Sequence, residues 1–99
     1  MILITAKATV SEENRVSYLK LCAEQVENSR EEEGCLDYGF YEDAMARGSF
    51  IFVERWKDQA ALDFHFKQSY CLDFIRSVRK LSVSASPIEI HHVAETLQP

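Results

Sequence analysis

The sequence predicts an α+β domain whose strands and helices follow the order β-α-β-β-α-β, the order of a ferredoxin-like fold. Three observations support this prediction. A chain of 99 residues makes one domain, residues 1–99. Runs of alternating apolar residues are interleaved with runs of helical period. A short link joins the second and third strands, which suits a hairpin. We therefore expect one antiparallel sheet with helices on one face.

The first strand is predicted at residues 2–10 and the first helix at residues 11–33. Alternation along ILITAKATV gives one face formed by Ile2, Ile4, Ala6, Ala8 and Val10. Ser11 is a favourable N-cap residue for the helix that follows. Helical spacing then gives an apolar stripe formed by Val16, Leu19, Ala23 and Val26. Gly34 stands where a glycine commonly ends a helix.

The second and third strands are predicted at residues 35–43 and 49–56, joined by a turn at residues 44–48. In the second strand, Leu36, Tyr38 and Phe40 share a face. In the third strand, alternation gives one face formed by Phe50, Phe52, Glu54 and Trp56. The turn is short enough for the two strands to pair antiparallel.

Two short helices and a last strand complete the prediction. Asp58 can cap a helix that runs to about Lys67, and Ser69 can cap the next one. The apolar side of that second helix is predicted from Leu72, Ile75 and Val78 or Arg79. Residues 82–86 and Pro87 are predicted to form a loop. The last strand is predicted at residues 88–94, with one side formed by Ile88, Ile90 and His92.

The predicted sheet carries apolar or aromatic residues on both faces of its first two strands. Helices cover only one face of such a sheet, so the other face would be left in water in a lone two-layer domain. Two sheets packed face to face would bury these residues. The sequence therefore predicts a homodimer.

Composition argues against several classes of protein. A net charge of -5 with scattered lysines and arginines argues against nucleic-acid binding, which needs a basic surface. No apolar run approaches the roughly 20 residues that a membrane-spanning helix needs. The cysteines are widely spaced, and we count no histidine as close enough in sequence to activate one; they are Cys22, Cys35 and Cys71. We therefore expect reduced thiols, without a catalytic cysteine, in a cytoplasmic protein. His91 and His92 point to opposite faces of a strand, so no metal site is expected.

The most informative segment is FIFVERWKDQAALDFH, residues 50–65. A strand ends there in Glu54 and Trp56, and an alanine-rich helical segment delivers His65 nine residues later. The segment contains an E-x-W…A-L-x-x-H pattern formed by Glu54, Trp56, Ala61, Leu62 and His65. A strand followed by a long helix at the start, and EEGCLDY at residues 32–38, complete the match. With these features the chain resembles the antibiotic biosynthesis monooxygenase superfamily.

The resemblance implies a dimeric α/β barrel, with one pocket per subunit between the sheet and the helices. Members include cofactor-free oxygenases of quinols and anthrone-type polyketides, isomerases of small phosphorylated sugars, and haem-degrading enzymes. The haem-degrading members use an early Asn, a pocket Trp and a His ligand. Here the corresponding positions hold Lys7 and Ala8, then His65, then Ile75 or Arg76. The resemblance therefore argues against haem degradation, and we expect no cofactor.

His65 and Trp56 are the candidate catalytic residues. Imidazole titrates near neutrality, so His65 could act as a base or proton shuttle. It could equally hydrogen-bond between helix and sheet to hold the fold. Trp56 could form part of a substrate slot, with Glu54 beside it. For both residues a structural role at the strand end is the favoured alternative.

The remaining candidates would bind the substrate. An aromatic slot for a flat molecule is expected from Tyr38, Phe40, Phe52 and Phe66, which could also be plain core. Lys7 could attract an anionic substrate or simply reach solvent. Tyr70 and Arg76 lie near the break between the two short helices, where surface positions are favoured. The run Glu31, Glu32 and Glu33 predicts a solvated helix end.

Three functions stay open at this point. The first is a cofactor-independent monooxygenase that oxidises a small quinol, anthrone or polyketide-like substrate with O2, with His65 as base. The second is an isomerase on the same scaffold, which abstracts a proton without O2. The third is a non-catalytic dimer that binds a ligand.

Overall fold

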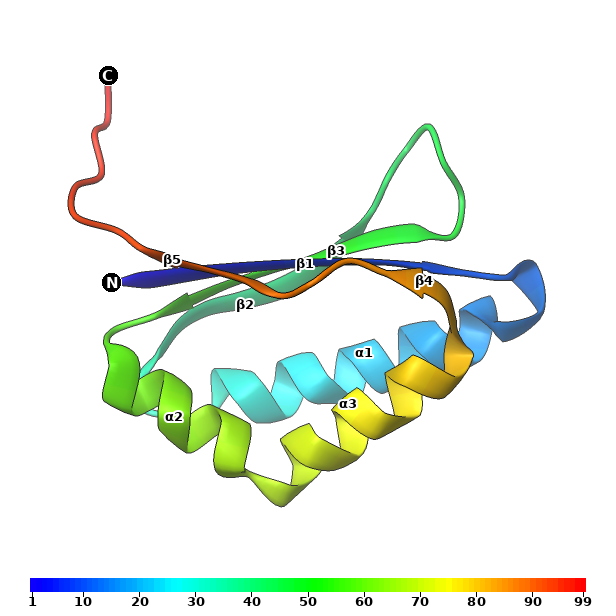
Figure 1. The fold of residues 1–99 in the computed structure, drawn as a ribbon, viewed down its shortest axis with the longest axis horizontal. Helices are drawn as coiled ribbons and strands as arrows, with labels where there is room; N and C mark the ends of the chain where they lie inside the picture. Colours follow the sequence, from blue (N-terminus) through cyan, green and yellow to red (C-terminus); the bar gives the residue numbers. More distant parts are fainter.

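One antiparallel sheet with helices packed on a single face makes up the domain (Figure 1). The computed structural model describes residues 1–99. The strands and helices follow in the order β1 (Ile2–Val10), η1 (a 3-10 helix, Glu12–Asn14), α1 (Arg15–Arg30), β2 (Cys35–Glu42), β3 (Ser49–Trp56), α2 (Gln59–Lys67), α3 (Ser69–Leu81), β4 (Ser82–Ala85) and β5 (Glu89–His92). None of its helices combines the length and the apolar character needed to cross a membrane.

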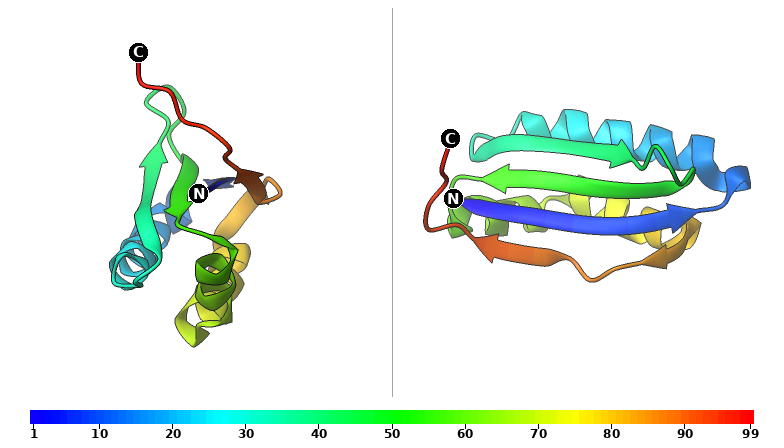
Figure 2. Two further views of the ribbon diagram at one scale, coloured as in Figure 1. Left: turned by 90° about the vertical axis from the view of Figure 1, so that its left-hand side faces the viewer. Right: turned by 90° about the horizontal axis from the view of Figure 1, so that it is seen from above.

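The strands lie in the order β2-β3-β1-β4, and β5 pairs with β1 further along the same edge (Figure 2). Strand β1 pairs antiparallel with β3, which places Ala6 opposite Phe52 and Ile4 opposite Glu54. The hairpin between β2 and β3 is present as predicted. The predicted ferredoxin-like α+β fold is confirmed.

The last edge strand differs from the prediction. Residues 82–85 form β4 and pair with Ala8, Thr9 and Val10, where the sequence predicted a loop. Strand β5 is shorter than the predicted 88–94 and pairs with the other end of β1. Pro87 lies between the two segments. Because proline has no backbone N–H to donate, it interrupts the ladder and divides one edge strand into two.

Helix α1 buries only half of the predicted apolar stripe: Val26 is in the core and Leu19 packs against it, but the other two residues are not. Val16 is 75% exposed and Ala23 is exposed, whereas the buried residues are Tyr18, Cys22, Gln25, Val26 and Ser29. Tyr18 packs on Phe50 with ring centroids 5.0 Å apart. The helix also ends at Arg30, earlier than predicted. Aromatic contacts and hydrogen bonds between polar side chains decide which face of α1 packs on the sheet. The spacing of apolar residues, on which the prediction rested, does not include them.

Strand β2 begins with an irregularity that moves Leu36 out of the core. The register with β3 shifts between Cys35 and Asp37, and Leu36 is 57% exposed. Tyr38 therefore points inward without Leu36 beside it. An extra residue on one strand breaks the alternation on which the prediction rested.

The caps of the last two helices follow the prediction in one case. The Asp58 carboxylate accepts the Ala61 N–H at 2.9 Å, as expected for an N-cap. Ser69 is instead the first residue of α3, and Gln68 holds the cap position without a side-chain bond.

In α3, Cys71 is buried while Leu72 is half exposed. The predicted apolar side is therefore wrong at Leu72, whereas Ile75 and Val78 are partly buried and line the cavity as part of that side.

Gly34 permits a close approach between chain segments and does not end α1. A Cβ at Gly34 would lie 2.2 Å from the Cβ of Ala61 on α2. The Gly34 carbonyl also accepts the Lys57 N–H at 3.0 Å. The segment after α1 is therefore pressed against the start of α2, and only a residue without a side chain fits between them.

We predict that Gly34→Ala lowers the free energy of unfolding by about 1–3 kcal/mol, the usual range for overpacking. Urea denaturation measures the change. Ala61→Gly is the matched background: it costs about 1 kcal/mol of helix propensity by itself, and Gly34→Ala should add little to it. An equal effect of Gly34→Ala in both backgrounds would contradict the close-approach explanation.

Candidate functional site

A cavity of about 340 Å³ lies between the sheet and α3. Its wall is mainly apolar and aromatic, with contributions from Ala6, Tyr18, Tyr38, Phe52, Phe66 and Phe74. Its buried polar side chains come from α1, β3 and α2, and they are Gln25, Glu54 and His65. A small volume with few polar groups in an apolar wall is typical of a site for a small organic molecule.

Glu54 is the buried carboxyl group of this cavity. Its position on β3 places it on the inner face of the sheet, and it is only 7% exposed. One oxygen accepts the indole N–H of Trp56 at 2.9 Å. Burial raises the pKa of Glu54 from 4.5 to about 7, and the bond from Trp56 opposes this rise. Glu54 can therefore gain or lose a proton near neutrality.

His65 is held by a carboxylate from another part of the chain. Its Nδ1 lies 2.7 Å from Oε2 of Glu32, and the Tyr70 hydroxyl donates to the same oxygen. Burial lowers the pKa of His65, and Glu32 opposes this change. The imidazole is 1% exposed. The predicted solvated helix end is thus wrong for Glu32, whose side chain is only 8% exposed.

Aromatic rings surround the imidazole and fix its plane. The ring of Trp56 lies 4.3 Å from that of His65, centroid to centroid, at an interplanar angle of 36°. Tyr38 lies 5.6 Å away on another side. Because Trp56 and Tyr38 come from β3 and β2, these contacts hold α2 against the sheet.

A polar chain continues from His65 towards α1. Its Nε2 lies 3.5 Å from the sulfur of Cys71 on α3. The Gln25 amide donates to the Tyr38 hydroxyl at 3.2 Å and to the Cys71 sulfur at 3.7 Å. Four polar side chains from four segments therefore touch one another beside the cavity.

The sequence reasoning did not single out Gln25, Glu32 or Cys71 for this site. Gln25 is polar and lay outside the predicted apolar stripe, and Glu32 lay in an acidic run. The one available signal was the separation of Cys71 from His65 by six residues across a helix break, which is short enough for contact if the chain turns there. Such a turn between α2 and α3 is present.

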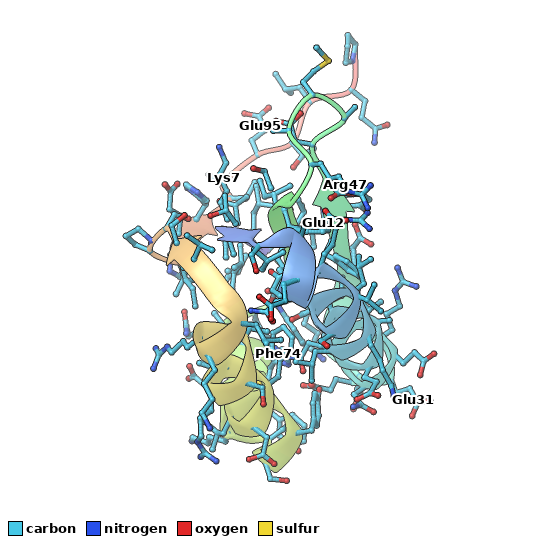
Figure 3. The ribbon with its side chains drawn as sticks, turned by 90° about the vertical axis from the view of Figure 1, so that its right-hand side faces the viewer. Lys7, Glu12, Glu31, Arg47, Phe74 and Glu95 are labelled. Atoms are coloured by element: carbon cyan, nitrogen blue, oxygen red, sulfur yellow. The ribbon has the colours of Figure 1, made fainter.

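The predicted site residues divide into three groups. Those that line the cavity are Tyr38, Phe52, Glu54, His65 and Phe66. Trp56 is fully buried behind this wall, and Phe40 stacks on Phe52 at 5.6 Å. Lys7 borders the cavity, but its side chain extends from the opposite face of the sheet, whereas Phe74 points inward from α3 (Figure 3).

Two residues near the helix break also have clear positions. Tyr70 is partly buried by its bond to Glu32, contrary to the surface position that we favoured. Arg76 is exposed and pairs with Asp73 at 3.3 Å. The His, Cys, Asp and Glu side chains form no group of three that could hold a metal ion.

The arrangement provides two groups that could exchange protons with a molecule bound in the cavity. A carboxyl group that titrates near neutrality lies in the wall, and a neutral imidazole paired to a carboxylate lies close by. Both groups are shielded from water, which strengthens their interaction with a bound molecule.

Comparison with known proteins identifies the family. Residues 1–77 match the family model described as antibiotic biosynthesis monooxygenase. An uncharacterized Synechocystis protein, sll1783, is 35% identical over 96% of this chain, although the chain spans only 65% of that protein. The Bacillus subtilis protein named "Putative monooxygenase YcnE" is 30% identical over 91% of this chain and 93% of its own.

A solved structure agrees with the fold. The crystal structure of a Deinococcus radiodurans protein named for the same family superposes with a TM-score of 0.93. The match covers 100% of this chain and 98% of that one at 22% identity, and at this identity it supports the fold alone. With the family model covering most of the sequence, the chain belongs to the antibiotic biosynthesis monooxygenase family.

Proposed function

We propose that the protein is a cofactor-independent monooxygenase that oxidises a small aromatic substrate, of the quinol or anthrone type, with O2. The family to which it belongs supports oxygenation. The observation that carries the proposal is Glu54, a nearly buried carboxyl group in an aromatic-lined cavity whose pKa is raised to about 7. Such a group can deprotonate a phenol or an activated CH2 group and can later return the proton.

The substrate itself supplies the electrons in this reaction. Once deprotonated, an electron-rich phenolate or carbanion can pass an electron to O2, and the two resulting radicals combine. One oxygen atom then enters the substrate and the other leaves as water. The protein's part is to hold the ring, remove the proton and exclude bulk water. Flat aromatic walls from Tyr38, Phe52 and Phe66 suit this task.

We assign the role of base to Glu54 and give His65 a different part from the one first expected. Both ring nitrogens of His65 already face protein groups, Glu32 on one side and Cys71 on the other. Glu54, in contrast, accepts the Trp56 indole N–H with one oxygen only, and it lines the cavity. His65 and Trp56 are therefore proposed as positioning residues that hold the wall and Glu54 in place. A direct exchange of protons between His65 and the substrate is the alternative.

A second copy of the chain is the protein partner that we propose, with the bare face of the sheet as the interface. Helices cover only one face, and the other is open in Figure 1. Tyr41, which is 56% exposed, lies opposite Ile51 on that open face. Leu3 and Val53 share the same face by alternation. Residues of this kind support the sheet-to-sheet dimer expected from the sequence, which stays a prediction, as does a cytoplasmic location.

Oxygen uptake tests the proposed reaction. We predict that metal-stripped, flavin-free protein consumes O2 with at least one member of a panel of hydroquinones, dihydroxynaphthalenes and anthrones. Glu54→Gln should reduce the rate by about 100-fold or more, the usual contribution of a general base. Glu31→Gln makes the same chemical change at an exposed residue beside Glu32. It is the matched control and should keep the rate of the wild type.

Three results would contradict this proposal. If Glu54→Gln keeps the full rate, Glu54 is not the base, and His65→Gln then shows whether the imidazole takes that part. If product forms equally fast without O2, the protein is an isomerase and not an oxygenase. No uptake and no turnover with the whole panel would favour a binding protein.

The pH dependence gives a separate prediction. Glu54 must be ionised to accept a proton, so the rate should rise with pH through a midpoint near 7. Between pH 4.5 and about 7 the folded protein holds a proton that the unfolded chain has released, so this group lowers stability as pH rises. Denaturation from about pH 5 to about pH 8 should show a smaller loss for Glu54→Gln. Parallel curves for the two proteins would refute the raised pKa.

Light scattering coupled to size-exclusion chromatography tests the dimer. We predict the mass of two chains for the wild type and of one chain for Val53→Glu, because a carboxylate in an apolar interface would be buried without a partner. Val16→Glu, which alters an exposed residue on α1, should stay dimeric. A single-chain mass for the wild type would refute the dimer.

A further inference from the structure

Cys71 is the buried group that the proposed oxygenase does not use. Its side chain is 1% exposed, yet it lines the same cavity as Glu54. Its sulfur lies 3.5 Å from Nε2 of His65, whose Nδ1 lies 2.7 Å from Glu32. A carboxylate, an imidazole and a thiol are therefore in contact one after the other, and the thiol lies in the cavity wall.

The hydrogen bonds of this line assign the protons. A carboxylate accepts and does not donate, so Glu32 takes the N–H of Nδ1. Burial lowers the pKa of His65, which leaves the ring neutral near pH 7 with a free electron pair on Nε2. That electron pair faces the thiol. His65 is thus oriented to accept the proton of Cys71, with the resulting charge balanced by Glu32.

Two further features would stabilise the sulfur once it is negative. The Gln25 amide points an N–H group at it from 3.7 Å. Cys71 also lies in the first turn of α3, a helix of 13 residues, where the helix dipole favours negative charge. Burial raises the pKa of Cys71 to about 11, so the resting group is a thiol. It becomes a nucleophile only as His65 removes its proton.

We propose that Cys71 is a nucleophile that adds to quinone-type carbonyl compounds bound in the cavity, with His65 as its base and Glu54 as the acid. The cavity carries aromatic walls for a flat ring, and Glu54 and Cys71 both line it. A quinone needs both groups, since it reacts with a nucleophile at ring carbon and with an acid at carbonyl oxygen. The result is covalent capture of the quinone.

The addition is balanced without any other reagent. Sulfur forms a bond to a ring carbon as the S–H bond breaks, and the thiol proton passes to Nε2 of His65. The electron pair of the ring C=C bond moves to the carbonyl oxygen, which takes a proton from Glu54. The proton of the attacked carbon is then lost as the second ring oxygen gains one. His65 releases the thiol proton and Glu54 regains one, so both groups return to their starting states and the count of protons closes. The product is a hydroquinone thioether.

This reaction goes beyond the proposed monooxygenase and does not depend on it. Capture needs no O2 and no turnover, and the two activities use different groups to start. An assay under nitrogen therefore tests Cys71 alone. Oxygen uptake could fail while capture succeeds, or the reverse, and each result would be read separately.

The test is labelling by 1,4-benzoquinone under nitrogen, at one equivalent per chain and pH 7, followed by peptide mass spectrometry over time. We expect Cys71 to gain the full mass of one quinone before Cys35 does, although Cys35 is the more exposed thiol. If exposure alone decided the order, Cys35 would react first and Cys71 would stay unmodified. That order would overturn the proposal.

Variants separate activation from mere access. In a Cys35→Ser background, His65→Gln should slow labelling of Cys71 on the order of 100-fold, as expected on loss of a general base. Glu32→Gln should also slow labelling of Cys71. If His65→Gln does not fold, Glu32→Gln is the variant that tests the role of the imidazole. Circular dichroism and thermal melting identify folded variants. An unchanged labelling rate in a folded variant of either residue would refute the part assigned to the imidazole.

Discussion

The contact between Glu32 and His65 is the interaction on which the rest of the site depends. It joins the segment after α1 to helix α2 across 2.7 Å, in a place where both side chains are nearly excluded from water. A buried carboxylate without partners is unfavourable by several kcal/mol, so this pairing can persist only if the helix is held at one position. Gly34 and Ala61 provide that position, because their backbones approach too closely for another side chain.

The position of α2 in turn orders the groups around the cavity. It brings the His65 ring against Trp56, and Trp56 donates to Glu54. Burial that stabilises the domain is therefore also what raises the pKa of Glu54 and lowers that of His65. One oxygen of Glu32 remains buried without a hydrogen-bond partner. A domain selected for stability alone would gain by replacing such groups with apolar ones, and their presence favours a chemical role.

Much of the fold could be predicted because its signals are local. Alternation placed Phe52 and Glu54 on the buried face of β3, and the Asp58 cap depends on a contact three residues away. The errors came from contacts between distant segments. Residues 82–85 become a strand only through pairing with β1. Gln25 can be buried because Tyr38 and Cys71 accept hydrogen bonds from its side-chain amide. Neither contact can be predicted from the residues next to it in the sequence.

The site shows the same division more sharply. His65, Glu54 and Trp56 belong to one continuous segment, so the sequence could single them out together. Their partners Glu32 and Cys71 lie on either side of this segment, one in an acidic run and one beyond a helix break. Without these partners, an imidazole with a free nitrogen is the natural choice for a base that faces the substrate. With them, both nitrogens are engaged, which is why we propose Glu54 as the base for the substrate and His65 as the base for the thiol.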